Sequence, residues 1–439
     1  MRASHRQRNP RLLFVTRALD VGGTERHLAQ IAPGLVRRGF DVTLYCITKT
    51  GAQVDEIAAS GIKVAGPAPA KGATRGLGTA LTIASGALGL IPEMLLQRPD
   101  IAHFYLPHAF LAGSIAAAIT QVPIRIMSRR CQNLYQLKHP RMARLEHWLH
   151  GSMTAVLGNS QSIVDELVHN EGVAAAKVGL IYNGIDLANF TGPVNCAEMR
   201  AKLGIEADAT VIGTLANLNS YKGHNDLVAA LAMIKDRLPK PWHLLAIGRD
   251  DGELAALRAQ SSQLGLDGNI HWLGMRRDTV ALLRACDLAV LASHQEGFSN
   301  AVIESMAASL PMIVTGVGGN AEAVLHGING LVVPARDPAR LGDAIALLAN
   351  NPGLSAAMGK AGQERAVSQF SIEACLNKYE AMYRALLARQ TLPRDIAAAG
   401  LTPSQPMASQ TSVRTAGGSI LPPRARQEAA STGIFAEHA

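Results

Sequence analysis

The stretch that decides the fold is residues 292–320, ASHQEGFSNAVIESMAASLPMIVTGVGGN. It follows the apolar run CDLAVLAS, which has the length of one buried strand. Within it, AVIESMAAS is expected to form a helix, capped by an oxygen of Ser299 or Asn300, and LPMIVTG the next strand. The order strand, loop, helix, strand is the repeating unit of a parallel α/β sheet.

Two carboxylates frame the loop of this unit. Glu296 comes just after the first predicted strand, and Glu304 lies about one turn into the helix. A helix N-terminus offers free amides and a partial positive charge, which attract phosphate, while a carboxylate can accept hydrogen bonds from a diol. The unit therefore suits a nucleotide sugar. An ordinary βαβ unit with solvated glutamates is the alternative that spacing alone leaves open.

The same pattern occurs elsewhere in the chain. Residues 210–234 predict a strand, a polar loop and a helix, with Lys222 and Gly223 at the loop-to-helix junction. A lysine there can pair with a phosphate, and a glycine allows close approach of the backbone. Near the N-terminus, a strand is followed by Gly22 and Gly23, a predicted ligand-facing turn, and by Thr24, the expected helix cap. This turn lacks the GxGxxG pattern of dehydrogenases.

These repeats predict an α/β protein of two Rossmann-like, doubly wound parallel-sheet domains whose strand carboxyl ends face an interdomain cleft. The expected segments are an N-terminal extension (1–10), an acceptor-side domain (11–186), a donor domain (187–370), a helix that crosses back to the first domain (371–390) and a disordered tail (391–439).

Charge is unevenly distributed. The net charge is +8, and residues 1–186 hold 20 Lys and Arg against 12 Asp and Glu. The basic half suits an anionic membrane surface or a phosphate-bearing acceptor, although a solvated basic surface explains it equally. Nucleic acid is disfavoured, because aromatic residues make up 4% and do not alternate with basic ones.

Two segments bear on membranes. Residues 77–97 are nearly uncharged, but their glycines, Pro92 and Glu93 favour a helix packed on the sheet over a transmembrane span. The basic helix predicted at 138–150 carries Leu145 and Trp148 beside two arginines, a pattern that fits either anionic lipid or a solvated face.

The cysteine spacing and the first residues of the chain indicate the cellular compartment. The five cysteines are scattered, without CxxC or metal-ligand spacing, which indicates a reducing compartment and predicts no metal site. The first residues lack the apolar run of a signal peptide. We therefore expect a cytoplasmic protein.

The run HQEGFSNAVIESMAASLPMIVTGVGGNAEAV resembles the E-x7-E signature of the retaining glycosyltransferases of family 4, which have the GT-B fold. Further landmarks of that family are similar and in the right order, namely GGTERHLAQIAPGLVRRGFDV, RPDIAH, NGID and KGHNDLVAA. The resemblance covers about residues 11–390.

The resemblance implies transfer of a hexosyl group, with retention, from a UDP- or GDP-linked sugar. The acceptor would be a glycan or a lipid-linked molecule in the synthesis of cell-surface polysaccharide, lipopolysaccharide or glycolipid. No metal and no cofactor beyond the nucleotide sugar is implied. The expected location is the cytoplasm or, peripherally, the inner face of the plasma membrane.

The resemblance also implies residue roles. Lys222 would neutralise the diphosphate leaving group, Glu296 would contact the donor sugar, and Glu304 would hold the ribose hydroxyls. Phe298, Ser299 and Asn300 would meet sugar and phosphate, partly through backbone amides, and Gly22 and Gly23 would approach the phosphates from the other domain. A front-side mechanism, in which the leaving phosphate accepts the acceptor's proton, is the preferred hypothesis, with Glu296 as nucleophile the alternative.

Two positions depart from the family. Asn217 stands where an arginine is usual, and Arg129 stands where a histidine is usual. Arg129 cannot act as a general base, but it or Arg249 could supply the missing auxiliary charge. Because of these departures, a non-catalytic nucleotide-sugar-binding module stays open as an alternative, as does a GT-B-fold epimerase or hydrolase of nucleotide sugars.

Overall fold

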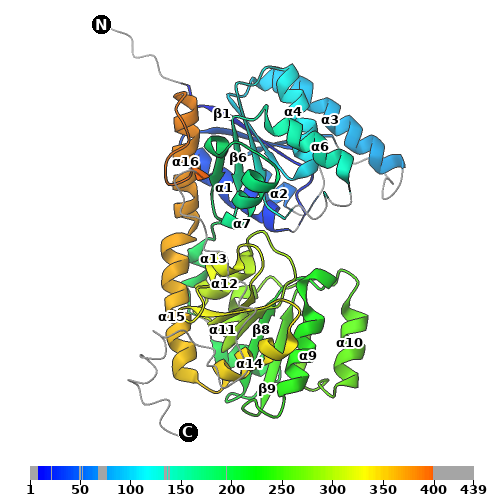
Figure 1. Cartoon of the computed structure of the whole chain (residues 1–439), viewed down its shortest axis with the longest axis vertical. Helices are drawn as coiled ribbons and strands as arrows, with labels where there is room; N and C mark the ends of the chain where they lie inside the picture. Colours follow the sequence, from blue (N-terminus) through cyan, green and yellow to red (C-terminus); the bar gives the residue numbers. More distant parts are fainter. Residues whose placement is uncertain are drawn as a thin grey trace. The chain divides into compact units, whose positions relative to one another are not determined.

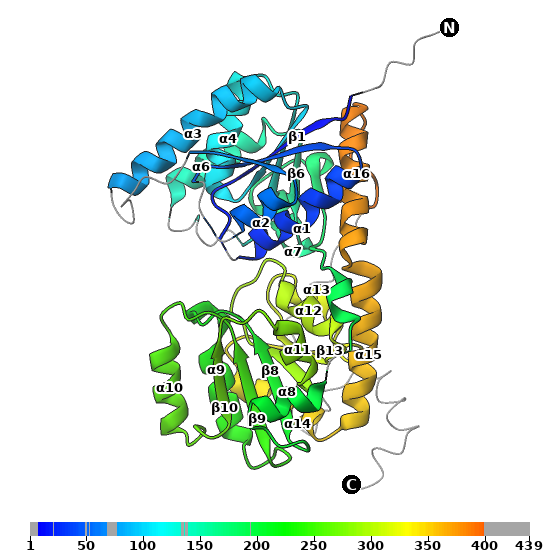
Figure 2. The ribbon, with the colours of Figure 1, turned by 180° about the vertical axis from the view of Figure 1, so that it is seen from behind.

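The computed structural model describes residues 8–398 except 21, 49–50, 52, 68–76, 133–135, 137–138 and 194, with only the backbone for 77–83. The first part of the predicted N-terminal extension and the predicted tail beyond residue 398 lie outside the described residues. The described chain forms two compact units (Figures 1 and 2). Unit 1 comprises the residues up to Ile185 and those from Ile372 onward, and unit 2 comprises Asp186–Ser371.

Unit 1 is built on a parallel sheet, seven-stranded in its described part, with the order β3-β2-β1-β4-β5-β6-β7. The strands are short, largely buried apolar runs, as expected when helices cover both faces. Their bounds are β1 (Arg11–Thr16), β2 (Asp41–Cys46), β3 (Lys63–Ala65), β4 (Ile101–Tyr105), β5 (Ile124–Arg129), β6 (Ala155–Gly158) and β7 (Val178–Leu180).

Helices pack on both faces of this sheet. One apolar core lies under α1 (Gly23–Arg37), α2 (Val54–Ala59) and α16 (Ile372–Leu387). The opposite core lies under α3 (Leu77–Gln97), α4 (Pro107–Ile119), α6 (Pro140–His150) and α7 (Gln161–Asp165). Short helical turns, η1 (Glu166–Asn170) and η2 (Ala175–Lys177), precede β7.

The uncharged segment that forms α3 packs on the sheet, as predicted. Its Leu90 and Met94 side chains are buried in the core beneath α3 and α4. Within the part of the chain that the structure describes, no helix combines the length and the apolar character that a membrane crossing requires.

The helix α16 is held in unit 1 by polar and apolar contacts. The hydroxyl of Tyr379 lies 3.1 Å from Nε2 of His27, and that of Tyr383 lies 2.7 Å from Nδ1 of His103. Burial, the largest cause, lowers the pKa of both histidines well below its ordinary value. The imidazoles are therefore neutral and can hydrogen-bond to the tyrosines without burying a charge.

Residues 391–398, the start of the predicted disordered tail, pack on unit 1. Disorder predicted from residue 391 is wrong for residues 391–398, because Leu392 and Ile396 bury their side chains in the core under α16. The amide of Leu180 donates to the carbonyl of Ile396 at 2.8 Å, and Ala397 pairs with Gly179 in an antiparallel bridge. Apolar burial and edge pairing thus order this segment.

Unit 2 repeats the architecture, with six parallel strands in its described part and the order β10-β9-β8-β11-β12-β13. The strands are β8 (Thr210–Leu215), β9 (Trp242–Ile247), β10 (Ile270–Gly274), β11 (Leu288–Leu291), β12 (Met312–Thr315) and β13 (Gly330–Val333). The helices are α8 (Cys196–Lys202), α9 (His224–Ile234), α10 (Leu254–Gln263), α11 (Thr279–Arg284), α12 (Asn300–Ala307), α13 (Asn320–Ala323), α14 (Pro338–Ala349) and α15 (Pro352–Gln369). Short turns are η3 (Leu187–Phe190) and η4 (Ser220–Lys222).

In each unit the first strand lies inside the sheet. β1 lies between β2 and β4, and β8 lies between β9 and β11. The chain therefore winds outward from the first strand in both directions. Ligands of doubly wound sheets bind at the carboxyl ends of the two strands where the winding reverses. These edges, β1/β4 in unit 1 and β8/β11 in unit 2, are where functional residues are expected.

Candidate active site

The loops after β8 and β11 bring together two predicted catalytic residues. Lys222 ends the turn η4, and Glu296 follows β11. Because β8 and β11 are neighbours, their carboxyl ends meet, and Nζ of Lys222 donates to Oε1 of Glu296 at 2.6 Å. The sequence placed Glu296 at a strand end and Lys222 at a loop-to-helix junction. Only the strand order makes them a pair.

A glycine sets the position of Lys222. Gly223 has a φ of +68°, and a Cβ there would lie 2.0 Å from the carbonyl oxygen of Ala292. The amide of His294 donates to the carbonyl of Tyr221 at 2.7 Å. The backbone of η4 therefore rests on the end of β11. No side chain fits between them without moving the loop.

Residues that the sequence analysis missed hold Glu296. Oγ of Ser293, which is fully buried, donates to Oε1 of Glu296 at 2.7 Å. Gly318 has a φ of +51°, and a Cβ on it would lie 1.9 Å from the carbonyl oxygen of Glu296. The amide of Gly319 donates to the carbonyl of Gly297 at 2.8 Å. The glycines in TGVGG, directly after a strand, were the available signal for this close approach.

The helix α12 begins beside this pair. Ser299 occupies its N-cap position, but its side chain makes no cap hydrogen bond, so the predicted capping by the Ser299 oxygen is wrong. First-turn amides without a side-chain cap can be satisfied by an anionic ligand. Asn300 is the first helical residue, and Glu304 is partly buried further along the helix.

The side chain of Phe298 packs against another aromatic residue. It is buried, and its ring centroid lies 5.2 Å from that of Phe370. The aromatic ring therefore packs within unit 2. Any contribution of this residue to ligand binding would come from its backbone.

Asn217 and Arg249 lie side by side at the same sheet edge. Oδ1 of Asn217 accepts from the backbone amide of Arg249 at 3.2 Å. The Arg249 side chain is about half exposed, and its Nε donates to Oδ1 of Asp251 at 2.7 Å. A guanidinium, paired with Asp251, therefore lies next to Asn217, the position where the resemblance implies an arginine.

A buried histidine supports this loop. Nε2 of His224 lies 3.2 Å from the carbonyl oxygen of Asn217, which can only accept, so Nε2 carries the proton. Burial, the largest cause, lowers the pKa of His224 to about 4. The neutral imidazole thus ties the start of α9 to the loop after β8.

Arg129 is not a ligand-facing charge. Its side chain is 1% exposed and donates to both carboxylate oxygens of Glu171, at 2.7 and 3.1 Å, and to Glu146 at 3.3 Å. The prediction that it supplies auxiliary charge is wrong, because two buried carboxylates already neutralise it. Burial acts to raise the pKa of Glu171, but hydrogen bonds from His150 and Arg129 and the Arg129 charge outweigh it and lower the pKa to about 2.

The Gly-Gly turn lies in unit 1, after β1. Gly22 is the N-cap of α1, so the prediction of Thr24 as the cap is wrong. A Cβ on Gly22 would lie 2.3 Å from Oε2 of Glu25. This carboxylate therefore lies close to the Gly22–Gly23 turn where a phosphate was predicted. Burial, the largest cause, raises its pKa.

No cluster of three or more His, Cys, Asp or Glu side chains suited to a metal ion occurs among the residues for which positions are described. The predicted site residues thus fall into two groups. Unit 2 holds the Lys222–Glu296 pair together with the residues at 217, 249, 298–300 and 304, while unit 1 holds the Gly-Gly turn and the buried Arg129.

Each unit matches a family model. Residues 21–189 match the model described as Glycosyltransferase Family 4, and residues 196–365 match the model described as Glycosyl transferases group 1. The chain is 25% identical over 389 residues to a D-inositol 3-phosphate glycosyltransferase of Corynebacterium diphtheriae, covering 83% of this chain and 90% of that protein. It is 26% identical over 300 residues to the capsular polysaccharide biosynthesis glycosyltransferase CapM of Staphylococcus aureus, covering 66% and 78%.

Solved structures share the fold. The crystal structure of Anabaena HepE in complex with UDP superposes with a TM-score of 0.75 at 23% identity, covering 85% of this chain and 100% of that one. WaaG, a glycosyltransferase involved in lipopolysaccharide biosynthesis, superposes with a TM-score of 0.65 at 17% identity. The predicted GT-B architecture of two Rossmann-like parallel-sheet domains is confirmed.

Proposed function

The chain belongs to glycosyltransferase family 4, and on that premise we propose that it is a retaining, metal-independent hexosyltransferase that uses a UDP- or GDP-linked sugar. The observation that carries the proposal is the 2.6 Å contact between Lys222 and Glu296 at the β8/β11 edge, beside the start of α12. This edge combines an ammonium group, a carboxylate and helix amides, which are the groups that a diphosphate and a sugar require.

The donor would bind to side chains that are already in position. Lys222 has three N–H donors, so it can bind the diphosphate while keeping Glu296, which in turn accepts from sugar hydroxyls. Glu304 holds the ribose, and Arg249 adds the charge that Asn217 lacks. A nucleotide-sugar donor is supported by the similar Anabaena protein, whose crystal structures are complexes with UDP and with UDP-glucose.

The proposed reaction is a front-side displacement. The bond between the anomeric carbon and the phosphate oxygen breaks, and the acceptor oxygen bonds to that carbon on the same face. The acceptor's proton passes to the departing phosphate oxygen, so no protein base is required. Lys222 and the α12 amides stabilise the negative charge that develops on the diphosphate.

The competing mechanism uses Glu296 as a nucleophile. Its Oε1 already accepts hydrogen bonds from Lys222 and Ser293, which stabilise the carboxylate and make it less nucleophilic. A slow fluorinated donor sugar, followed by mass spectrometry of the intact protein, separates the two. A sugar covalently bound to Glu296 would overturn the front-side mechanism.

The first test is a thermal-shift screen of nucleotide sugars, since a donor that binds the native state raises the melting temperature. The donor found there is then used to compare the turnover of Lys222→Ala with that of Lys240→Ala, an exposed lysine in a surface pair. We expect turnover to be lost only in the first, and to survive treatment with EDTA in the wild type.

The outcomes separate the alternatives. A chain that binds a nucleoside diphosphate but transfers no sugar to glycan or lipid acceptors is a binding module. Release of free nucleotide without an acceptor indicates an epimerase or a hydrolase. Binding of no nucleotide sugar at all contradicts the proposal.

We further propose that the acceptor is a glycan or lipid-linked molecule of cell-surface polysaccharide or glycolipid synthesis, reached from the cytoplasm at an anionic membrane. Figure 1 shows α3, α4 and α6 side by side on one face of unit 1, and they pack against each other in that order. Their outer surface, here called the α3–α4–α6 surface, exposes Leu88, Leu95, Leu96, Ile115, Ile119, Leu145 and Trp148. Clustered exposed apolar side chains of this kind mark interaction sites.

The membrane contact is tested by cosedimentation with vesicles of phosphatidylglycerol and phosphatidylcholine. We expect wild-type protein to sediment with them and the double variant Leu96→Ser, Trp148→Ser to stay in the supernatant. The double variant Met233→Ser, Met275→Ser, which removes exposed apolar side chains from unit 2, serves as the control. Wild-type protein that never sediments with anionic vesicles would contradict this part of the proposal.

A further inference from the structure

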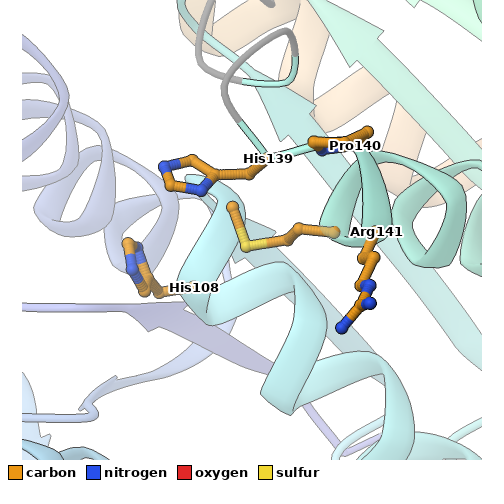
Figure 3. Close-up of a pocket in the computed structure, with 5 residues that line it drawn as sticks. His108, His139, Pro140 and Arg141 are labelled. Atoms are coloured by element: carbon orange, nitrogen blue, oxygen red, sulfur yellow. The ribbon is translucent and has the colours of Figure 1, made fainter.

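A pocket of about 510 Å³ lies in unit 1 between the starts of two helices (Figure 3). Its lining residues are His108 from the start of α4 and His139, Pro140, Arg141 and Met142 from the start of α6. Volumes of this size are typical of sites that hold a small molecule or the head group of a larger one.

The pocket is at the unit 1 sheet edge where ligands are expected. α4 directly follows β4, whose neighbour β1 is the strand at which the winding reverses. Burial and, after it, the charge of Arg17, which follows β1, lower the pKa of His108. Arg17 itself pairs with Asp20 at 4.0 Å.

The polar part of the lining favours an anion. The lining includes two histidines and one arginine, and none of its described lining residues is acidic. α4 and α6 both begin with proline and lack a side-chain cap, so both helix dipoles present their positive ends there. Glu146, which acts on His108 in the opposite sense to Arg17, is already paired with Arg129 at 3.3 Å.

The rest of the surroundings are apolar. Pro140 and Met142 complete the lining, and the same two helices continue into the α3–α4–α6 surface with Ile115, Leu145 and Trp148 exposed. A ligand that fits both features has an anionic head and an apolar chain. The charge in the pocket and the exposed apolar surface would otherwise be unrelated features of the same helices.

We propose that this pocket binds the phosphate of a lipid-linked acceptor, with His108, His139 and Arg141 as its ligands and the apolar chain directed along α4 and α6. The inference rests on the proposed glycosyl transfer, and it names the chemical class of the acceptor. Hydrogen bonds from an arginine to phosphate are charge-assisted and stronger than neutral ones.

The test measures binding of three probes by calorimetry: farnesyl phosphate, farnesol and inorganic phosphate. We expect farnesyl phosphate to bind at least about tenfold more tightly than either of the others, which each lack one half of the ligand. Arg141→Ala and His139→Ala should each weaken the binding of farnesyl phosphate by roughly tenfold or more. Arg144→Ala, an exposed arginine on α6 outside the lining, is the matched control and should change it less than about twofold.

Each other outcome is informative. If farnesol binds as tightly as farnesyl phosphate, the pocket does not recognise the phosphate. If inorganic phosphate binds as tightly as farnesyl phosphate, the pocket does not recognise the lipid chain, which indicates a soluble phosphorylated acceptor. If the double variant Arg141→Ala, His139→Ala binds farnesyl phosphate as tightly as the wild type, this pocket is not the binding site. The thermal shift caused by the nucleotide sugar is measured on the same variants. If the nucleotide sugar still shifts the melting temperature but farnesyl phosphate does not bind, only the acceptor pocket is contradicted. If no nucleotide sugar shifts the melting temperature of the wild type, the proposed function is contradicted separately.

Discussion

Each unit carries a basic residue paired with glutamate near the carboxyl end of a strand, and the two pairs have different consequences. At the β8/β11 edge of unit 2, the side chains of Lys222 and Glu296 are 17% and 9% exposed. In unit 1, at the end of β5, those of Arg129 and Glu171 are both 1% exposed. The first pair is held by loops at the carboxyl edge, where a ligand can reach it. The second is sealed beneath α6 and serves the fold.

Under the proposed function, access rather than residue type separates the binding cation Lys222 from the structural cation Arg129. A fully buried pair that loses one partner leaves an uncompensated charge, whereas a partly exposed pair can be solvated or bound by a ligand. The contrast predicts that substitutions in the unit 1 pair act on stability and substitutions in the unit 2 pair act on turnover.

The largest effect is expected from Arg129→Met. It leaves Glu171 and Glu146 buried without their guanidinium, which should cost about 3–5 kcal/mol of unfolding free energy. Urea denaturation followed by circular dichroism measures the loss. Arg144→Met, on the exposed face of α6, should change stability by less than about 0.5 kcal/mol. Equal stability of the two variants would contradict the structural role of Arg129.

Lys222→Ala is expected to act on catalysis. Removing a cation that stabilises the leaving diphosphate should lower turnover on the order of 10²–10³-fold. Its stability should fall far less than that of Arg129→Met, because Glu296 keeps its hydrogen bond from Ser293. Steady-state kinetics and urea denaturation on the same preparation decide this. A Lys222→Ala variant that is unstable but fully active would show that this pair acts on stability rather than on turnover.

Gly223→Ala tests whether the close approach of η4 to β11 matters. The new methyl group would lie 2.0 Å from the carbonyl oxygen of Ala292, in a backbone conformation with φ of +68°. We expect a loss of roughly 2–4 kcal/mol from strain plus overpacking, together with reduced turnover as Lys222 moves.

The matched control is Gly204→Ala. Gly204 has a φ of +69°, and a Cβ there would meet no atom within 4 Å. It should therefore show the backbone strain alone, about 1–2 kcal/mol. Thermal unfolding of both variants isolates the contribution of the clash, and identical losses would show that η4 moves freely away from β11.

The smallest effect concerns pH. The pKa of His224 is about 4 in the folded state and near 6.5 when unfolded, so its neutral form stabilises unit 2 fully above pH 6.5, and this stability is lost as the pH falls toward 4. The loss between pH 7 and pH 5 should be about 1–2 kcal/mol. His224→Gln keeps a donor for the Asn217 carbonyl but cannot take up a proton, so the difference in unfolding free energy between pH 7 and pH 5 should disappear. Urea denaturation at both pH values measures this difference.

Glu171 provides the contrast in unit 1. Its folded pKa of about 2 lies below its ordinary value, so its contribution is present above about pH 4.5 and is lost only as the pH falls toward 2. Glu171→Gln should therefore leave the difference between pH 7 and pH 5 unchanged, although its overall stability is lower. A change of that difference in Glu171→Gln equal to that in His224→Gln would contradict the two pKa directions.

The unit 2 edge was predictable because its residues lie in short local motifs. Glu296 follows a strand, Lys222 comes just before a helix and Glu304 lies about one turn into a helix, and apolar patterning locates these elements without any tertiary information. The residues that hold them were missed, because Ser293 and Gly318 act through contacts that depend on which strands are neighbours.

The unit 1 edge was predicted less well. Arg129 is the last residue of β5, but its partners Glu146 and Glu171 lie on other elements, and the sequence does not show that they enclose it. His139 and Arg141 lie within a helix predicted for its basic character, yet only the packing of α6 beside α4 places them around a pocket.

By itself, the sequence determined the alternation of short apolar strands and helices, the two-domain α/β class and the position of the donor motifs, because these depend on local spacing and polarity. The tertiary structure alone decided which charges face a ligand and which are neutralised, where the pocket lies, and that residues 391–398 are ordered. The reason is physical: burial and ion pairing depend on strand order and helix packing, which join residues far apart in the chain, and a local pattern carries no record of those partners.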